Sequence, residues 1–133
     1  MIHTIHIVIT SMLVGIIWII QRVHYPAFKY VGSAKADDFH HMHTLNITPI
    51  VAPLMVAELI LVCYEVYIGS HSVAWIYLLL VLIIWGSTFG IQVPLHNRLS
   101  SSYKGDEVER LIKTNWIRTV AWSVKLAVMF YYF

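Results

Sequence analysis

The sequence predicts an all-α integral membrane protein, an antiparallel bundle of four helices with both termini outside the cytoplasm. Of the 133 residues, 59% are hydrophobic and 12% are charged, whereas about a quarter of the residues in an ordinary soluble domain are charged. The mean hydropathy is +0.70, and the apolar residues form four continuous runs instead of an alternating pattern. Lipid must therefore surround most of the chain, and in lipid a helix satisfies its own backbone hydrogen bonds.

The four apolar runs set the positions of the helices. Each run has close to the ~20 residues that cross a hydrocarbon core of about 30 Å. They cover residues 5–20, 45–67, 73–93 and 116–133. With polar extensions at their ends, they predict one domain over residues 1–133, with helices at about 3–24, 36–68, 73–96 and 107–133.

The first helix is expected to be retained in the protein. No Lys or Arg precedes its apolar run and no small-residue cleavage site follows it, so it does not match a signal peptide. It is expected to end near His24, because Pro26 disfavours a helical conformation at the preceding Tyr25.

The second helix contains Pro49 and Pro53, which are expected to bend it, and Gly69 marks its C-terminal end. The single cysteine, Cys63, lies within this helix. One cysteine excludes an intramolecular disulfide framework and a Cys-based zinc site.

The third helix contains Gly86 and Gly90, a spacing of small residues that lets helices approach closely. This pair is interpreted either as a packing contact inside the bundle or as the contact face of a homo-oligomer. The fourth helix follows a polar loop, and Asp106 and Glu109 are favourable in its first turn.

The Lys and Arg residues indicate which end of the bundle faces the cytoplasm. All but Lys125 lie in or beside the loops that follow the first and third helices, and short loops rich in Lys and Arg remain in the cytoplasm. We therefore expect a multi-pass protein of the inner (plasma) membrane with both termini extracytoplasmic. The net charge of +2 follows from this topology, and no nucleic-acid partner is expected. The residues concerned are Arg22, Lys29, Lys35, Arg98, Lys104, Arg110, Lys113 and Arg118.

Every predicted helix carries polar side chains at its cytoplasmic end. Antiparallel helices bring these ends together, so the side chains are expected to line a shared cavity. The alternative is that they meet water and lipid headgroups at the membrane surface. The set comprises Gln21, His24, His40, His41, His43, Asn46, Gln92, His96, Asn115, Arg118 and Thr119.

Four of these histidines are candidate ligands for a transition metal or haem: His24, His40, His43 and His96. Neutral imidazole is the commonest metal ligand, and helix bundles build cofactor sites from side chains on facing helices. Their spacing matches no strict metal-binding motif. The other candidates for a role in catalysis are Arg118, Asn115 and Gln92, which would orient a polar group of the substrate, and Glu58.

Glu58 and Lys125 lie near the middle of their membrane segments. An isolated charge is costly there, so both are expected to face the interior and to pair. At about 1.5 Å per residue, Glu58 lies roughly 22 Å along the helix from His43, too far to share a metal with it. The pair is interpreted as a packing device, as part of a proton relay, or as the acidic floor of a substrate pocket.

Three short runs carry a resemblance to known proteins: QRVHYPAF at 21–28, QVPLHN at 92–97 and NWIRT at 115–119. They resemble small bacterial four-helix membrane proteins of uncharacterised function. More distantly, they are similar to the anthrone-oxygenase-like family, four-helix proteins with an Asn/His-x-x-Arg motif that opens the last helix. The resemblance implies an oxygenase or related activity on an aromatic or quinone-like compound, with Asn115 and Arg118 as matching positions. His40, His41 and His43 are not matched, which argues against an identical reaction.

The leading hypothesis is a membrane-embedded oxidoreductase or cofactor-binding protein that acts on a hydrophobic or quinone-like compound at the cytoplasmic end. A competing hypothesis is a small proton-coupled transporter, working as a dimer, with Glu58 as the coupling carboxylate. A third is an accessory subunit whose polar end binds a partner protein.

Overall fold

The computed structural model describes residues 1–31, 35–101 and 105–132, and it confirms the predicted all-α class. The helices join into four long segments. The first consists of α1 (Ile2–Ile19), the π-helical turn η1 (Ile20–His24) and α2 (Tyr25–Ala27). The second is α3 (Ala36–Tyr67). The third consists of α4 (Ala74–Ser87), the π-helical turn η3 (Thr88–Gln92) and α5 (Val93–Ser101), and the fourth is α6 (Gly105–Tyr131).

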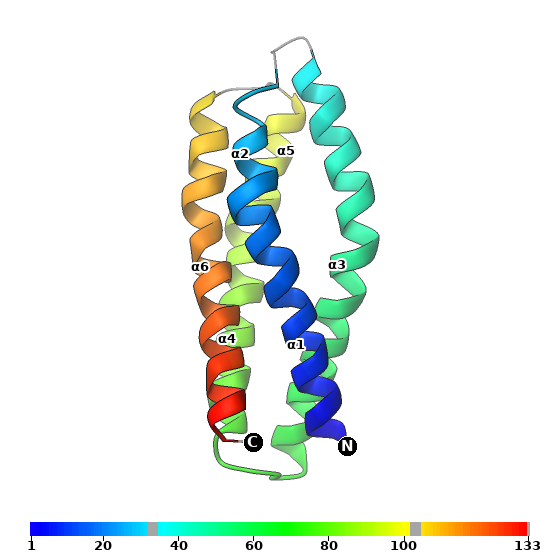
Figure 1. Ribbon diagram of the computed structural model, residues 1–133, viewed down its shortest axis with the longest axis vertical. Coiled ribbons are helices and arrows are strands. Elements are labelled where there is room, and N and C mark those ends of the chain that lie inside the picture. The colour runs from blue at the N-terminus through cyan, green and yellow to red at the C-terminus, as the bar shows by residue number, and fades with distance from the viewer. Residues whose placement is uncertain (32–34, 102–104, 133) are drawn as a thin grey trace.

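The four segments lie side by side along the long axis of the molecule (Figure 1). α1 contacts α3 and α6, and α4 also contacts α3 and α6. Both chain termini and the turn from α3 to α4 lie at one end, which we call the terminal end. The opposite end carries α2, α5 and the first turns of α3 and α6, and we call it the basic end.

Three segments are long and apolar enough to cross a membrane: Ile2–Ala27, Ala36–Tyr67 and Ala74–Ser100. They make this a membrane protein. α6 does not meet the same criterion within the described residues, because Arg118, Lys125 and other polar residues lower its hydropathy. Phe133, with which the fourth predicted helix ends, lies outside the residues that the structure describes.

Prolines interrupt the helices less than predicted. The expected end of the first helix near His24 is wrong, since helical structure continues to Ala27. Pro26 lies directly after the π-helical turn η1, so the helical segment passes through a residue that has no N–H to donate. α3 is continuous through Pro49 and Pro53, where the sequence predicts a bend and not an end of the helix.

The distribution of polarity is that of a membrane protein, with charged groups inside and large apolar side chains outside. Glu58 and Lys125 have no exposed surface, whereas Leu45, Ile60 and Leu79 are about 60% exposed. The buried apolar side chains form three clusters along the axis. The middle cluster consists of Leu13, Ile17, Met55, Ile84, Ala121 and Trp122, and it separates the polar groups of the two ends.

Candidate ligand cavity near the basic end

Two π-helical turns lie on either side of the site. η1 ends at His24 and is followed two residues later by Pro26, and η3 ends at Gln92 and is followed two residues later by Pro94. A π-turn widens the helix by one residue, and such turns occur frequently at functional sites. The residue directly after η1, Tyr25, is buried in the interior, and so is the last residue of η3, Gln92.

A cavity of about 410 Å³ lies between α3 and the third segment. Its walls are mostly apolar, and its polar side chains gather at the end nearer α2 and α5. Several lining residues, including Ala52, Val56 and Phe89, are also exposed on the outer surface, so the cavity opens sideways between the helices. The apolar walls include Ile47, Val51, Met55, Trp85 and Phe89, and the polar residues include Tyr25, His43, Gln92, His96 and Arg118.

Arg118 supplies a buried positive charge to the polar end of this cavity. Its Nε donates to Asn115 Oδ1 at 2.9 Å, and its Nη2 makes a second, short contact with the same oxygen. Asn115 is held in turn by donating to Gln21 Oε1 at 2.7 Å. Longer hydrogen bonds of 3.4–3.5 Å link the guanidinium to Thr88, Tyr25 and Gln92. Among the described residues, no carboxylate forms an ion pair with Arg118.

A chain of hydrogen bonds leads from Arg118 to the surface at the basic end. Tyr25 Oη lies 3.0 Å from His96 Nε2, and His96 Nδ1 lies 2.9 Å from His40 Nε2. His40 Nδ1 lies 3.2 Å from Ser100 Oγ, whose proton goes to the carbonyl of His96. The direction follows from Ser100: its oxygen accepts from His40 Nδ1–H, so His40 Nε2 accepts from His96, and His96 accepts from Tyr25.

The four predicted ligand histidines come together, but in pairs. His40 and His96 share a hydrogen bond. The second nitrogen of each ring is also engaged, with Ser100 for His40 and with Tyr25 for His96. His24 stacks on His43 with ring centroids 4.2 Å apart, and His24 Nε2 is buried without a hydrogen-bond partner. Within the described residues, no three of these histidines place nitrogens within 4.8 Å of one another. A metal or haem at this site stays a prediction.

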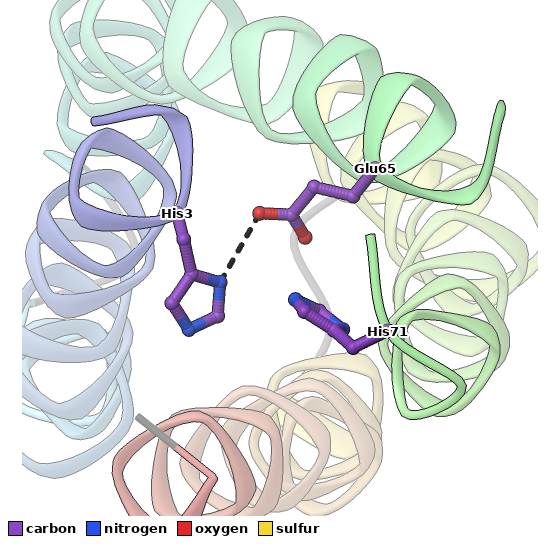
Figure 2. A group of neighbouring side chains, drawn as sticks. All are labelled: His3, Glu65 and His71. Carbon is purple, nitrogen blue, oxygen red and sulfur yellow. Dashed lines mark hydrogen bonds and ion pairs between the residues drawn. The ribbon is translucent and has the colours of Figure 1, made fainter. Parts of the chain in front are cut away.

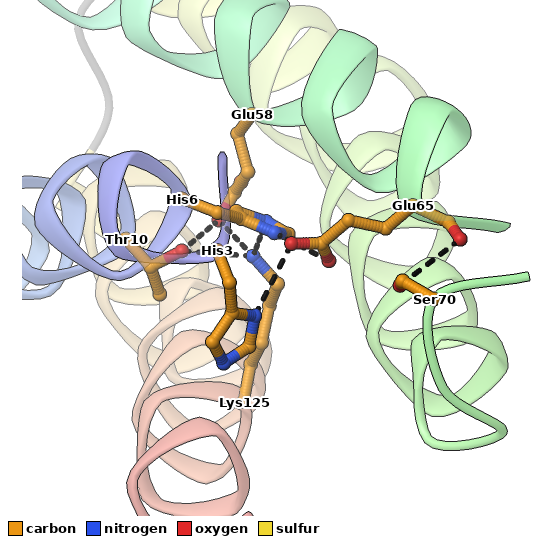
Figure 3. Close-up of polar contacts among 7 residues, drawn as sticks. All are labelled: His3, His6, Thr10, Glu58, Glu65, Ser70 and Lys125. Atoms are coloured by element: carbon orange, nitrogen blue, oxygen red, sulfur yellow. Dashed lines mark hydrogen bonds and ion pairs between the residues drawn. The ribbon is translucent and has the colours of Figure 1, made fainter. Parts of the chain in front are cut away.

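Glu58 lies outside this cavity, in a second polar network toward the terminal end (Figure 3). Its Oε1 accepts from Lys125 Nζ at 2.6 Å and from Thr10 Oγ1 at 3.1 Å, and its Oε2 accepts from Trp122 Nε1 at 2.9 Å. The predicted pairing of Glu58 with Lys125 is therefore present. Its interpretation as the floor of the pocket is not supported, because the middle apolar cluster separates Glu58 from the cavity that the structure shows.

The sequence missed some residues of the site. The sequence indicates Tyr25 only as the residue before a helix-breaking proline, although it is buried and links Arg118 to His96. Nothing in the sequence around Thr88, apart from its position between two glycines, indicates that it belongs to the site. His41 and Asn46, which were placed in the polar set, are exposed at the surface.

No family model, curated protein or solved structure matches this chain. What the fold and the site define is an all-helical membrane protein with a sideways-opening cavity that has apolar walls and a buried guanidinium at one end. The resemblance to the anthrone-oxygenase-like family stays a prediction.

Proposed function

We propose that this protein is a small membrane-embedded oxidoreductase that binds a quinone-like compound in the cavity and exchanges protons with it through Tyr25, His96 and His40. The observation that carries the proposal is Arg118, a buried cation at the polar end of an apolar cavity that has no carboxylate partner among the described residues. A buried charge needs compensation. A carbonyl or anionic oxygen of a bound compound would supply it.

The shape and chemistry of the cavity favour a membrane-soluble compound with a planar polar head. About 410 Å³ is within the usual size of small-molecule sites, which combine apolar walls with a few oriented polar groups. Trp85 lines the wall, and its buried Nε1 has no hydrogen-bond partner within residues 1–31, 35–101 and 105–132. Arg118 and Trp85 therefore offer two separate donors, as a compound with two carbonyl oxygens requires. The sideways opening allows entry from the lipid phase.

The hydrogen-bonded chain can supply one of the two protons that such a reaction needs; the other, at the oxygen near Trp85, would come from water, because an indole N–H does not release its proton. Reduction of a quinone to a quinol takes up two electrons and two protons, one at each carbonyl oxygen. Tyr25 Oη is within reach of Arg118, and the chain through His96 and His40 ends at the exposed Ser100. In the structure the donors of this chain point from Tyr25 toward Ser100. A proton given up by Tyr25 to the ligand would be replaced from the basic end after each imidazole has exchanged its proton between its two ring nitrogens.

The electrons would come from a redox partner or from a haem or metal at the predicted histidines. His24 and His43 are the pair best placed for this, because His40 and His96 are engaged in the hydrogen-bonded chain. An absorption spectrum and metal analysis of the purified protein test this part of the proposal. A colourless, metal-free protein of normal stability would remove the resident cofactor and leave an external electron donor.

For the membrane arrangement, we infer that α6 crosses the bilayer with the other three segments as an antiparallel four-helix bundle. α6 packs against α1 and α4 and directs Arg118 and Lys125 inward, which hides its charges from lipid. The basic loops place the basic end in the cytoplasm. Cysteine-accessibility labelling at the two ends, in intact cells and in inverted vesicles, tests this orientation.

The decisive experiment measures binding of a short-chain ubiquinone analogue to purified protein in detergent or nanodiscs. A charge-assisted hydrogen bond contributes about 1.5–3 kcal/mol, so Arg118→Gln should weaken binding by about 10-fold or more. The matched control is Arg22→Gln, because Arg22 is exposed near the same end. The absence of saturable binding, or equal affinity of the Arg118→Gln variant, would contradict the proposal.

The transport hypothesis has one observation in its favour: hydrogen bonds connect Glu58, Lys125, His6, Glu65 and His3 toward the terminal end (Figure 3). Protons could follow that route. Its test is proton-coupled flux in vesicles before and after Glu58→Gln. Unchanged flux would eliminate Glu58 as the coupling group.

A further inference from the structure

Three side chains from different parts of the chain meet at the terminal end: His3 of α1, Glu65 of α3 and His71 of the turn between α3 and α4 (Figure 2). One possible ligand atom from each lies within 4.8 Å of the other two. Glu65 is buried, and the two histidines are partly exposed. The rings and the carboxylate face a shared space between the helix ends.

His71 is the least explained member of this group. Both of its ring nitrogens are buried, and neither has a hydrogen-bond partner in the described part of the chain. The turn holds it in place: Gly69 adopts a φ of 60°, and the backbone N–H of Ser70 donates to the carbonyl of Glu65 at 3.1 Å. A buried polar atom without a partner is unfavourable, and a bound metal ion would take the lone pair of one of these two nitrogens.

The carboxylate of Glu65 is held by a hydrogen bond from His6 (Figure 3). Lys125 Nζ donates to His6 Nε2 at 2.8 Å, so the proton of the neutral His6 ring lies on Nδ1. His6 Nδ1 then donates to Glu65 Oε2 at 2.9 Å. This leaves Oε1 toward His3 and the shared space. Metal-binding carboxylates are commonly held by outer hydrogen bonds of this kind.

The spacing of the donors is close to that of a metal site. His3 Nδ1 lies 3.2 Å from Glu65 Oε1 in a hydrogen bond that a metal ion would replace, and two donors bound to one tetrahedral zinc ion at 2.0–2.1 Å are separated by roughly 3.3 Å. The third donor atom, on His71, lies within 4.8 Å of the other two and must come closer for all three to bind one ion. The buried ring of Tyr77 packs against both imidazoles, with centroid distances of 6.2 and 5.7 Å, and forms one wall.

We propose that His3, Glu65 and His71 bind one divalent transition-metal ion of the zinc class at the terminal end of the protein. Two neutral imidazoles and one carboxylate are a common ligand set for zinc, and they leave a fourth position for water or another ligand. The site lies on the far side of the middle apolar cluster from the cavity near the basic end. It is therefore independent of the function proposed above.

The test uses Co²⁺ and Zn²⁺ as probes on full-length protein that carries an affinity tag without histidines. After treatment with a chelator, Co²⁺ is titrated and the visible absorption of tetrahedral cobalt is recorded. We expect one Co²⁺ per chain, displaced by Zn²⁺. His71→Ala and Glu65→Gln should each weaken binding at least 10-fold, whereas His41→Ala, which changes an exposed histidine at the basic end, should not.

Helical circular dichroism and gel filtration confirm that each variant is folded. His71→Ala is the safest variant, because His71 lies in a turn and makes no hydrogen bond in the structure that its removal would break. Absence of the cobalt spectrum in the wild-type protein, or an equal affinity in His71→Ala, would overturn the proposal. Loss of binding in His41→Ala alone would place the metal elsewhere and would also overturn it.

Discussion

Lys125 Nζ donates a hydrogen bond of 2.6 Å to Glu58 Oε1, and neither side chain has any exposed surface. The ammonium uses its other two donors on Thr10 Oγ1 and His6 Nε2, both at 2.8 Å. The carboxylate of Glu58 also accepts hydrogen bonds from Thr10 and Trp122. Because these residues come from α1, α3 and α6, the pair fixes how three of the four segments pack.

Removal of either partner should destabilise the protein strongly. Glu58→Gln leaves Lys125 as an uncompensated buried charge, and Lys125→Met does the same to Glu58. Loss of one partner of a buried pair costs about 3–5 kcal/mol. The double variant Glu58→Gln/Lys125→Met should lose much less than the sum of the single losses, because neither charge remains. Unfolding by SDS titration in mixed micelles measures these free energies.

The matched control is the exposed pair of Lys113 and Glu109, which are one turn apart on α6. Lys113 Nζ lies 3.8 Å from Glu109 Oε2. Lys113→Met should change stability by less than about 1 kcal/mol, as surface pairs do. Additive losses in the Glu58 and Lys125 variants would show that the two charges do not act as a pair.

Asn115→Asp should weaken ligand binding near the basic end. The variant also loses the donor to Gln21 Oε1, so the amide of Gln21 must turn to keep a hydrogen bond at this position. The new carboxylate would lie where Asn115 Oδ1 now accepts from Arg118, and would neutralise its guanidinium. A bound carbonyl or anionic oxygen would then lose its charged partner, so the affinity for the quinone analogue should fall by about 10-fold or more. Equilibrium binding and thermal unfolding, measured on the same sample, separate the two effects.

The control for this variant is Asn46→Asp, which adds the same charge at an exposed position of α3. It should leave affinity unchanged. If Asn115→Asp binds the analogue as tightly as the wild-type protein, Arg118 does not recognise the ligand.

The sequence was sufficient to predict the pairing of Glu58 with Lys125. Isolated charges in long apolar runs must find partners, and the depth of each in its run can be counted. The same counting placed Gln92, Asn115 and Arg118 at one level, and the structure joins all three by hydrogen bonds.

What the sequence could not predict depends on local geometry. A π-turn has no simple residue pattern, so the continuation of the first helix through Pro26 and the inward position of Tyr25 were not foreseen. The meeting of Glu65 with His71 depends on the left-handed conformation of Gly69. The sequence indicated a turn there, but not which side chains it would bring together.

A ligand in the cavity should quench the fluorescence of Trp85, which lines the wall. Quinones are efficient quenchers at short range, so Trp85→Phe should remove a large part of the ligand-dependent decrease. Trp75→Phe changes an exposed tryptophan of α4 near the terminal end and should leave it intact. Equal quenching in both variants would place the ligand elsewhere on the protein.

Gly86 and Gly90 lie on the outer surface of the third segment, and nothing in the described chain lies within 4 Å of a Cβ built on either. They therefore do not serve the packing of helices within the chain, which was one of the two interpretations. The remaining interpretation is contact with a second copy, since paired small residues let membrane helices approach closely.

We expect Gly86→Leu to lower the dimer fraction several-fold in liposomes, measured by energy transfer between labelled copies over a range of protein-to-lipid ratios. The stability of the monomer should not fall, because leucine favours a helix over glycine by up to about 1 kcal/mol. Gly15→Leu is the matched control, since Gly15 is equally exposed on α1. Equal energy transfer in the wild-type protein and in both variants would exclude the glycine face as a contact between copies.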